Sequence, residues 1–143
     1  MTAALKRSCV PSHGRHLGAV GHFKRLKACE YAQAVAVLSK AAIKRLPATE
    51  ANALADQWRR ASYSVALNIA EGASRRGSRE FRKHLDIARA SLHELEAIME
   101  LAVSLEYFRA EELAKLEATV DECAKTVFGL MRKFGGPPSP PHS

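Results

Sequence analysis

The sequence predicts an all-α protein, an up-down-up-down antiparallel four-helix bundle. The 143-residue chain is 47% hydrophobic but only 6% aromatic. Ala and Leu are prominent among its apolar residues, which favours helices over sheets. Four segments, each about 22 to 27 residues long, repeat apolar residues at spacings of three and four and are joined by short connections. We expect the bundle to span residues 23–134, between a disordered arm at 1–22 and a disordered Pro-rich tail at 135–143.

The first helix is expected over residues 24–46. Its apolar residues repeat at spacings of four, three and four, so they share one face of a helix. These residues are Tyr31, Val35, Leu38 and Ala42. Pro47 should end the helix, because proline disfavours helical geometry in the residue before it.

The second helix is expected to start after Thr49, which is a plausible N-cap, with Glu50 in its first turn. Its apolar stripe consists of Leu54, Trp58, Ala61, Val65 and Ile69. We expect Gly72 to break the helix or to provide a left-handed C-cap.

The third helix is expected over residues 78–105, with Ser78 as its cap. Its apolar line is Phe81, Leu85, Ala88, Leu92, Leu95, Met99 and Ala102. A second line, apolar in its later part, makes this face wider than one partner helix needs. The fourth helix is expected over residues 110–134, where a heptad line from Leu113 to Phe134 ends at two glycines.

The net charge of +7 is unevenly distributed along the chain. Only 5 of the 15 Asp/Glu residues lie in residues 1–83, where most of the 22 Lys/Arg residues are found, and the other 10 lie in residues 84–143. A split of this kind predicts either a basic face for a polyanion or acidic and basic surfaces of neighbouring subunits that meet.

No motif for catalysis, metal binding or cofactor binding is present. A di-iron bundle needs Glu-x-x-His pairs, and no histidine here has a glutamate three residues before it. Nucleophile-elbow, P-loop and dinucleotide-binding patterns are also missing. We therefore expect a non-enzymatic protein without a metal or cofactor.

The cysteines and hydropathy predict a cytoplasmic location. Cys9, Cys29 and Cys123 are odd in number and lack paired spacing, which argues against a disulfide framework or a zinc site. We interpret Cys29 and Cys123 as small core residues. No apolar run is long enough to cross a membrane.

A cluster of basic residues is the best candidate for a functional surface. It lies between the second and third predicted helices and at the start of the third, and consists of Arg75, Arg76, Arg79, Arg82 and Lys83. Positive charge at a helix N-terminus opposes the helix dipole, which indicates a use such as phosphate binding. The alternative is a solvated face that is partly paired with Glu71, Glu80 and Asp86.

Asn68 stands alone among apolar residues of the second helix. We interpret it as a buried amide that forms a hydrogen bond across helices and fixes their register. Glu71 either cooperates with Asn68 or pairs with Arg60 or Arg75.

The sequence around these residues resembles the 23S rRNA intervening-sequence proteins, a family of four-helix bundles related to the accessory variability proteins of diversity-generating retroelements. The matching segments are QWRRA at 57–61, VALNIAEG at 65–72, RR at 75–76, SREF at 78–81, IARASL at 87–92 and ELE at 94–96. The resemblance covers residues 22–134. The chain departs from the family pattern at Cys29, where an aromatic residue is usual, and at Arg109, where a helix cap is expected.

The resemblance implies a homopentamer without enzymatic activity. Its retroelement relatives imply a basic accessory subunit that binds RNA or DNA and a reverse transcriptase. Carried over to this chain, the resemblance implies a basic surface that comprises Arg59, Arg60, Arg75, Arg76 and Arg79. The first hypothesis is therefore a nucleic-acid-binding accessory protein, and the second is a structural scaffold whose charge asymmetry serves subunit assembly.

Overall fold

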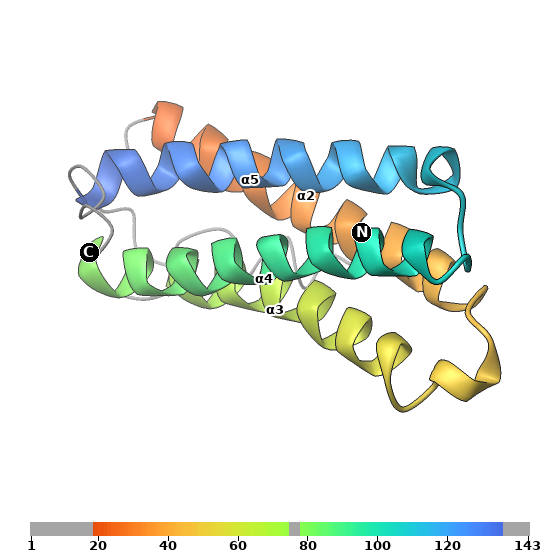
Figure 1. The fold of residues 1–143 in the computed structure, drawn as a ribbon. Coiled ribbons are helices and arrows are strands. Elements are labelled where there is room, and N and C mark those ends of the chain that lie inside the picture. The colour runs from red at the N-terminus through yellow and green to blue at the C-terminus, as the bar shows by residue number, and fades with distance from the viewer. Residues whose placement is uncertain (1–18, 75–77, 136–143) are drawn as a thin grey trace, which may run out of the picture.

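The computed structural model describes residues 19–74 and 78–135, with side chains described for 25–72 and 79–133. Over these ranges the protein is entirely helical and has no strand, as the sequence predicted (Figure 1). The long helices are α2 (Ala19–Ile43), α3 (Leu54–Ser74), α4 (Ser78–Ser104) and α5 (Ala114–Gly135). Two short 3-10 helices, η1 (Ala48–Glu50) and η2 (Ala110–Leu113), precede α3 and α5.

Each long helix packs against two others, α2 and α4 each contacting both α3 and α5. Ser64 of α3 contacts Ser91 of α4, whereas Asn68, one turn later, contacts the earlier residue His84, so these two helices run antiparallel. Figure 1 shows η1 and η2 at one end of the molecule, which we call the turn end. The start of α2, the start of α4 and the end of α5 lie at the opposite end.

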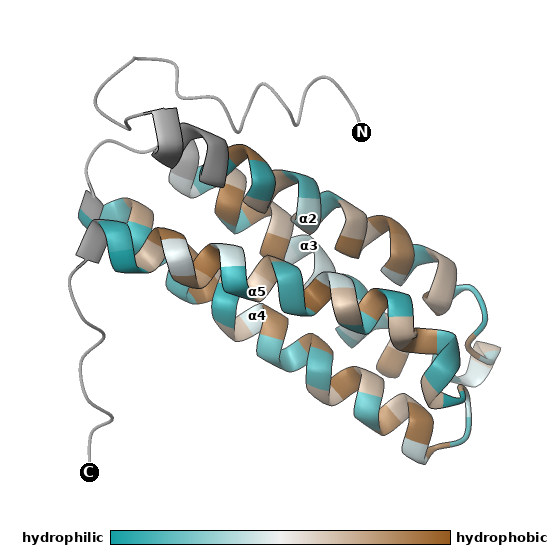
Figure 2. Ribbon diagram, turned by 90° about the horizontal axis from the view of Figure 1, so that it is seen from above, coloured by the Kyte–Doolittle hydropathy of each residue, from teal (hydrophilic) through white to brown (hydrophobic). Residues whose placement is uncertain are grey.

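The core is built from the predicted apolar stripes. Its largest fully buried side chains include Trp58, Ile69, Leu85 and Leu95. Trp58 donates a hydrogen bond from Nε1 to Ser39 Oγ over 3.2 Å and meets the ring of Phe108 edge to face. Figure 2 shows polar and apolar segments alternating along each helix, as expected for helices that bury one face.

Helix α2 starts five residues earlier and ends three residues earlier than predicted. At its end the hydrogen bonds tighten to three-residue spacing, with Arg45 N–H donating to Ala42 O and Leu46 N–H to Ile43 O, each over 3.0 Å. Because Pro47 disfavours α geometry in the preceding residue, the chain leaves the helix through this tighter turn.

The start of α3 corrects the predicted cap. Thr49 lies inside η1, and the α-helix begins only at Leu54. Glu50 Oε2 accepts the backbone N–H of Leu54 over 3.1 Å, so the carboxylate of Glu50 caps this helix.

Gly72 also differs from the prediction, because α3 continues through it to Ser74. Gly72 is buried, and a Cβ atom built there would lie 2.9 Å from both His84 Cβ and Phe81 Cδ2. Such a separation is too short for a methyl group. The glycine therefore allows α3 and α4 to approach closely and does not end the helix.

The fourth predicted helix begins with a 3-10 turn, and its α-helical part starts at Ala114. Arg109 precedes this turn, and its backbone N–H donates to Glu112 Oε1 over 3.0 Å. An arginine side chain has no acceptor with which to cap a helix N-terminus. The hydrogen-bond acceptor at this helix start is instead the carboxylate of Glu112, three residues later, which accepts the backbone N–H of Arg109.

Cys123 is a free, buried thiol whose pKa is raised to about 12 by burial, so it is inert at neutral pH. Cys29 is buried too but is disulfide-bonded, which the cysteine spacing did not predict. None of the helices in the described ranges has the length and apolar character needed to span a lipid bilayer.

Candidate functional site

The first turns of α4 carry three of the predicted basic residues. Arg79 and Lys83 are exposed and Arg82 is half-buried. Their spacing of three and four residues places them on one side of the helix. Arg75 and Arg76 lie outside the described residues, so their part in the cluster stays a prediction.

The last turn of α5 adds Arg132 and Lys133, both exposed, at the same end of the molecule (Figure 1). We call Arg79, Arg82, Lys83, Arg132 and Lys133 the basic end. The sequence reasoning missed the two α5 residues because they are 49 and 50 residues from Lys83. The predicted topology could have revealed them, because alternating helix directions bring the end of the fourth helix beside the start of the third.

Arg59 and Arg60 do not join the basic end. They lie in the first half of α3, and about 20 Å of helix separates Arg60 from the end of α3. Both pair with Asp56, Arg60 Nε at 3.0 Å and Arg59 Nη1 at 3.9 Å from its carboxylate oxygens. The structure thus divides the predicted basic surface into two separate groups.

Arg25 of α2 also lies at this end of the molecule but is only 6% exposed. Its guanidinium Cζ lies 4.6 Å from the centroid of the Phe81 ring, in the first turn of α4. Burial lowers the pKa of Arg25. The sequence reasoning missed Arg25, because periodicity does not reveal that a charged residue is buried.

Asn68 and Glu71 belong to different environments. The Asn68 side chain is half-buried, and its Oδ1 lies 3.1 Å from Nδ1 of His84 on α4. The predicted hydrogen bond across helices is therefore present, and its role in register stays a prediction. Glu71 is exposed on the surface of α3.

A line of exposed apolar side chains runs along α4 and ends at Leu105, the residue that directly follows the helix. Ile87, Leu101 and Leu105 are 40%, 49% and 45% exposed. On α3, Tyr63 and Leu67 are also more than half exposed. Exposed apolar side chains that gather on neighbouring helices are typical of protein interfaces.

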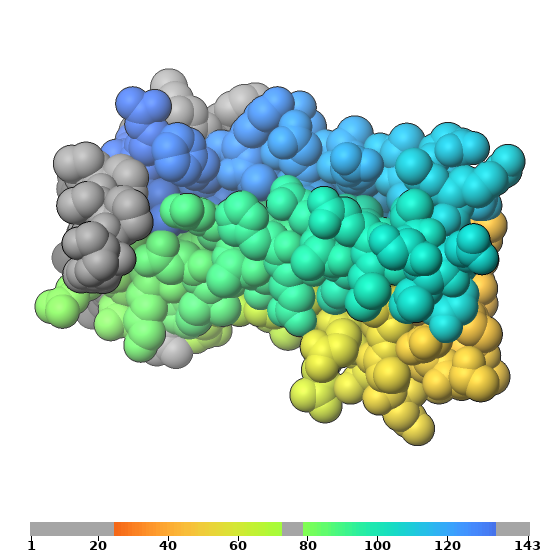
Figure 3. All heavy atoms as spheres, in the orientation of Figure 1, coloured from red at the N-terminus to blue at the C-terminus, as the bar shows by residue number. Residues whose placement is uncertain are grey.

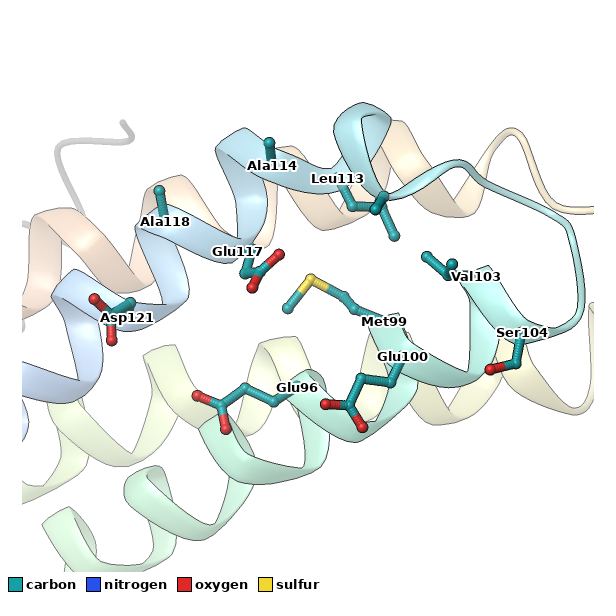
Figure 4. A pocket seen from close by; sticks show the side chains of 11 residues that line it. Glu96, Met99, Glu100, Val103, Ser104, Leu113, Ala114, Glu117, Ala118 and Asp121 are labelled. Atoms are coloured by element: carbon teal, nitrogen blue, oxygen red, sulfur yellow. The ribbon is translucent and has the colours of Figure 1, made fainter.

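An acidic groove of about 850 Å³ lies between α4 and α5 near the turn end. Figure 4 shows Glu96 and Glu100 of α4 opposite Glu117 and Asp121 of α5, with Met99 between the two helices. Figure 3 shows the same two helices side by side along one face of the molecule. The groove suits a partner that is both basic and apolar. The sequence reasoning missed it because its residues come from two helices.

Within the described side chains, no group of three or more His, Cys, Asp or Glu residues is arranged to hold a metal ion.

The family model of the 23S rRNA-intervening sequence proteins matches residues 24–129. This match covers well over half of the chain. The protein belongs to the 23S rRNA-intervening sequence protein family. No curated protein matches the chain.

The part of the chain that matches the 23S rRNA-intervening sequence proteins includes Arg25, the contacts between α3 and α4, and the basic first turns of α4. Arg132 and Lys133 lie just beyond it. The basic end is thus formed by the family segment together with the last turn of α5.

Proposed function

We propose that this protein is a non-enzymatic accessory protein that binds the phosphate backbone of RNA or DNA through its basic end. The proposal rests on the exposure of three cations at the basic end and on their lack of carboxylate partners among the described side chains. Arg79, Lys83 and Lys133 are exposed, and none forms an ion pair with a carboxylate among the described side chains, which include every Asp and Glu of the chain. By contrast, Arg59 and Arg60 share Asp56. Unpaired exposed cations are those that gain most from a phosphate.

The family description supports nucleic acid as the partner, since it refers to proteins of intervening sequences in 23S rRNA. Phosphate contacts position a protein on nucleic acid without reading its sequence. We therefore propose weak sequence preference, with affinity that depends strongly on salt concentration.

We further propose that the up-down-up-down bundle assembles into a homopentamer through the exposed apolar line of α4, Ile87, Leu101 and Leu105. Their exposure supports an interface, because covering them removes apolar area from water. The resemblance to retroelement accessory proteins adds a reverse transcriptase as a candidate partner. Repetition of the basic end around a ring would give several phosphate-binding surfaces on one particle, which increases avidity.

A salt titration of binding to labelled RNA and duplex DNA tests the nucleic-acid proposal. Wild type should bind with a log-log salt slope of several units. Arg79→Glu/Lys83→Glu should weaken binding and lower the magnitude of the slope by at least about 1.5, since each phosphate contact contributes about 0.7 to 0.9.

The matched control is Lys44→Glu/Lys115→Glu, which reverses two exposed charges at the turn end. It should retain most of the affinity. The proposal fails if wild type does not bind even at low salt, or if both double variants lose equal affinity, which would indicate net charge alone.

The acidic groove favours a second candidate function, a scaffold for protein assembly in which the groove receives a basic segment of another subunit. Under this alternative, Glu100→Lys/Glu117→Lys should dissociate the oligomer while wild type shows no nucleic-acid binding. Light scattering with the same binding titration distinguishes the two functions.

A further inference from the structure

The Arg25 side chain is a buried charge that forms no ion pair with a carboxylate among the described side chains. All 15 Asp and Glu residues lie in the ranges whose side chains are described. The ion pairs that those carboxylates form involve other cations, and Arg25 Nε is buried with no hydrogen-bond partner among the described residues. Burial of a charged group is unfavourable unless it is paired and hydrogen-bonded.

Arg45 at the turn end provides an internal comparison. Its guanidinium Cζ lies 4.9 Å from the centroid of Phe108, much as Arg25 lies over Phe81. Arg45, however, is exposed and also forms an ion pair with Glu112. Arg132 also lies over a ring, that of Phe128, at a longer distance of 6.0 Å. Of the two closer arginine–phenylalanine pairs among the described residues, only the more exposed one, Arg45, has a carboxylate partner.

The surroundings of Arg25 favour an anion. Phe81 is in the first turn of α4, so the guanidinium lies over a side chain that comes from the N-terminal turn of a 27-residue helix. Backbone N–H groups of a first helical turn lack intrahelical acceptors, and the helix dipole adds positive potential there. Arg82 follows Phe81 directly in the chain, and Arg79 precedes it by two residues. The first turn of α4 also carries the acidic Glu80, so the anion-binding character of this helix start comes from its backbone N–H groups together with Arg79 and Arg82.

We propose that Arg25 and the first turn of α4 form a binding site for one phosphate group. Arg25 supplies charge and N–H donors from a fixed position on Phe81, and the α4 amides supply further donors, as helix N-termini do for phosphates. This inference deepens the proposed function, because a backbone phosphate of RNA or DNA is the expected occupant. Inorganic phosphate shares that chemistry and serves as the probe for the site alone.

The first experiment measures thermal unfolding of the full chain in sodium phosphate and in sodium chloride at equal ionic strength. Phosphate should raise the Tm of wild type by about 4 °C at ten times its dissociation constant. Arg25→Met keeps an apolar contact with Phe81 but removes the charge, and it should abolish the increment that phosphate adds over chloride. Arg25→Lys should keep part of the increment, because lysine provides a point charge without the planar fork.

The matched control is Arg45→Met, which removes the arginine that lies at a similar distance over Phe108. It should show the same phosphate increment as wild type even if its Tm in chloride is lower. The site is refuted if wild type gains no more from phosphate than from chloride. It is equally refuted if Arg25→Met keeps the increment.

The second experiment separates the site from the proposed function by titrating RNA with wild type and Arg25→Met. If the site holds a backbone phosphate, the variant should lose about one unit of salt slope. If phosphate stabilises wild type through Arg25 but no RNA or DNA binds, the site is confirmed as a site for free phosphate. The proposed nucleic-acid function then fails. If RNA binds wild type and Arg25→Met with equal affinity and slope, the nucleic-acid function stands and Arg25 is not part of that interface.

Discussion

Nδ1 of His84 on α4 lies 3.1 Å from Oδ1 of Asn68 on α3. Asn68 Nδ2 donates to the backbone carbonyl of Ser64 over 2.8 Å and lies 3.1 Å from Ser64 Oγ. Because a carbonyl oxygen can only accept, the amide group of Asn68 must point its nitrogen to Ser64 and its oxygen to His84. His84 must therefore donate from Nδ1. Ser91 Oγ extends the network by donating to Ser64 Oγ over 2.7 Å. The lone asparagine is thus the centre of a polar seam between two helices.

Removal of either member of this pair should destabilise the protein. We expect Asn68→Ala and His84→Ala each to cost about 1 to 2 kcal/mol of unfolding free energy, because each leaves a half-buried polar group without its partner. The double variant should show a coupling energy of at least about 0.5 kcal/mol in urea unfolding.

His93 is the control for this cycle, as it lies on the same helix but is exposed, with its Nδ1 3.4 Å from Glu96 Oε2. His93→Ala should change stability by less than about 0.5 kcal/mol. Strict additivity of the Asn68 and His84 variants would show that the seam does not couple the helices.

Gly72→Ala tests the close approach of the same two helices. The substitution adds helix propensity, worth about 1 kcal/mol in an open position. Here the new Cβ would lie 2.9 Å from His84 Cβ and Phe81 Cδ2, so α3 and α4 must separate. We expect a net loss of about 1 to 3 kcal/mol in urea unfolding.

Gly129→Ala is the comparison, since this glycine is in the interior of α5 and half-exposed. It should be neutral or stabilise by up to about 1 kcal/mol. Equal stabilisation by both substitutions would mean that Gly72 is not needed for helix packing.

The apolar stripes were predictable because they follow a single helical period. Trp58, Val65 and Leu85 are fully buried as their spacing indicates. The helix ends were less predictable. Thr49 has the residue type of an N-cap, but the chain forms η1 there and uses the Glu50 carboxylate instead. The N-cap preference of threonine is a property of one residue, whereas the position of a helix cap depends on the path of the whole connection that leads into the helix.

The candidate site was only partly predictable for a related reason. Arg79 and Lys83 share a helix face that spacing reveals. The stacking of Arg25 on Phe81 joins residues 56 positions apart, and the burial of a charge contradicts the usual preference of arginine for the surface. Contacts of this kind depend on how the helices pack, which the residue pattern of one helix does not contain.

Glu112 at the turn end should make stability depend on acidic pH. Its pKa is lowered from 4.5 to about 2, chiefly because its carboxylate accepts the Arg109 backbone N–H and then because of Arg45. A lowered pKa in the folded state gives stability that is present above about pH 4.5 and is lost as the pH falls towards 2. Glu112→Gln should therefore show a shallower loss of stability between pH 5 and 2.

Carboxyl NMR titration checks the cause of this shift. Arg45→Met should raise the pKa of Glu112 only partly, because the hydrogen bond from Arg109 N–H is the larger contribution. A return to the ordinary pKa in Arg45→Met would show that the ion pair dominates instead.

The exposed apolar line of α4 should control the oligomeric state. Leu101 and Leu105 are one turn apart on the same face and are nearly half exposed. An interface that covers them would have to desolvate two carboxylates in Leu101→Glu/Leu105→Glu, which is strongly unfavourable. Size-exclusion chromatography with light scattering should therefore show wild type as an oligomer and this variant as smaller species. The control is Val37→Glu on α2, because Val37 is 67% exposed but lies on a helix outside the proposed interface. It should keep the wild-type mass, and an unchanged mass in the α4 variant would place the subunit contact on another face.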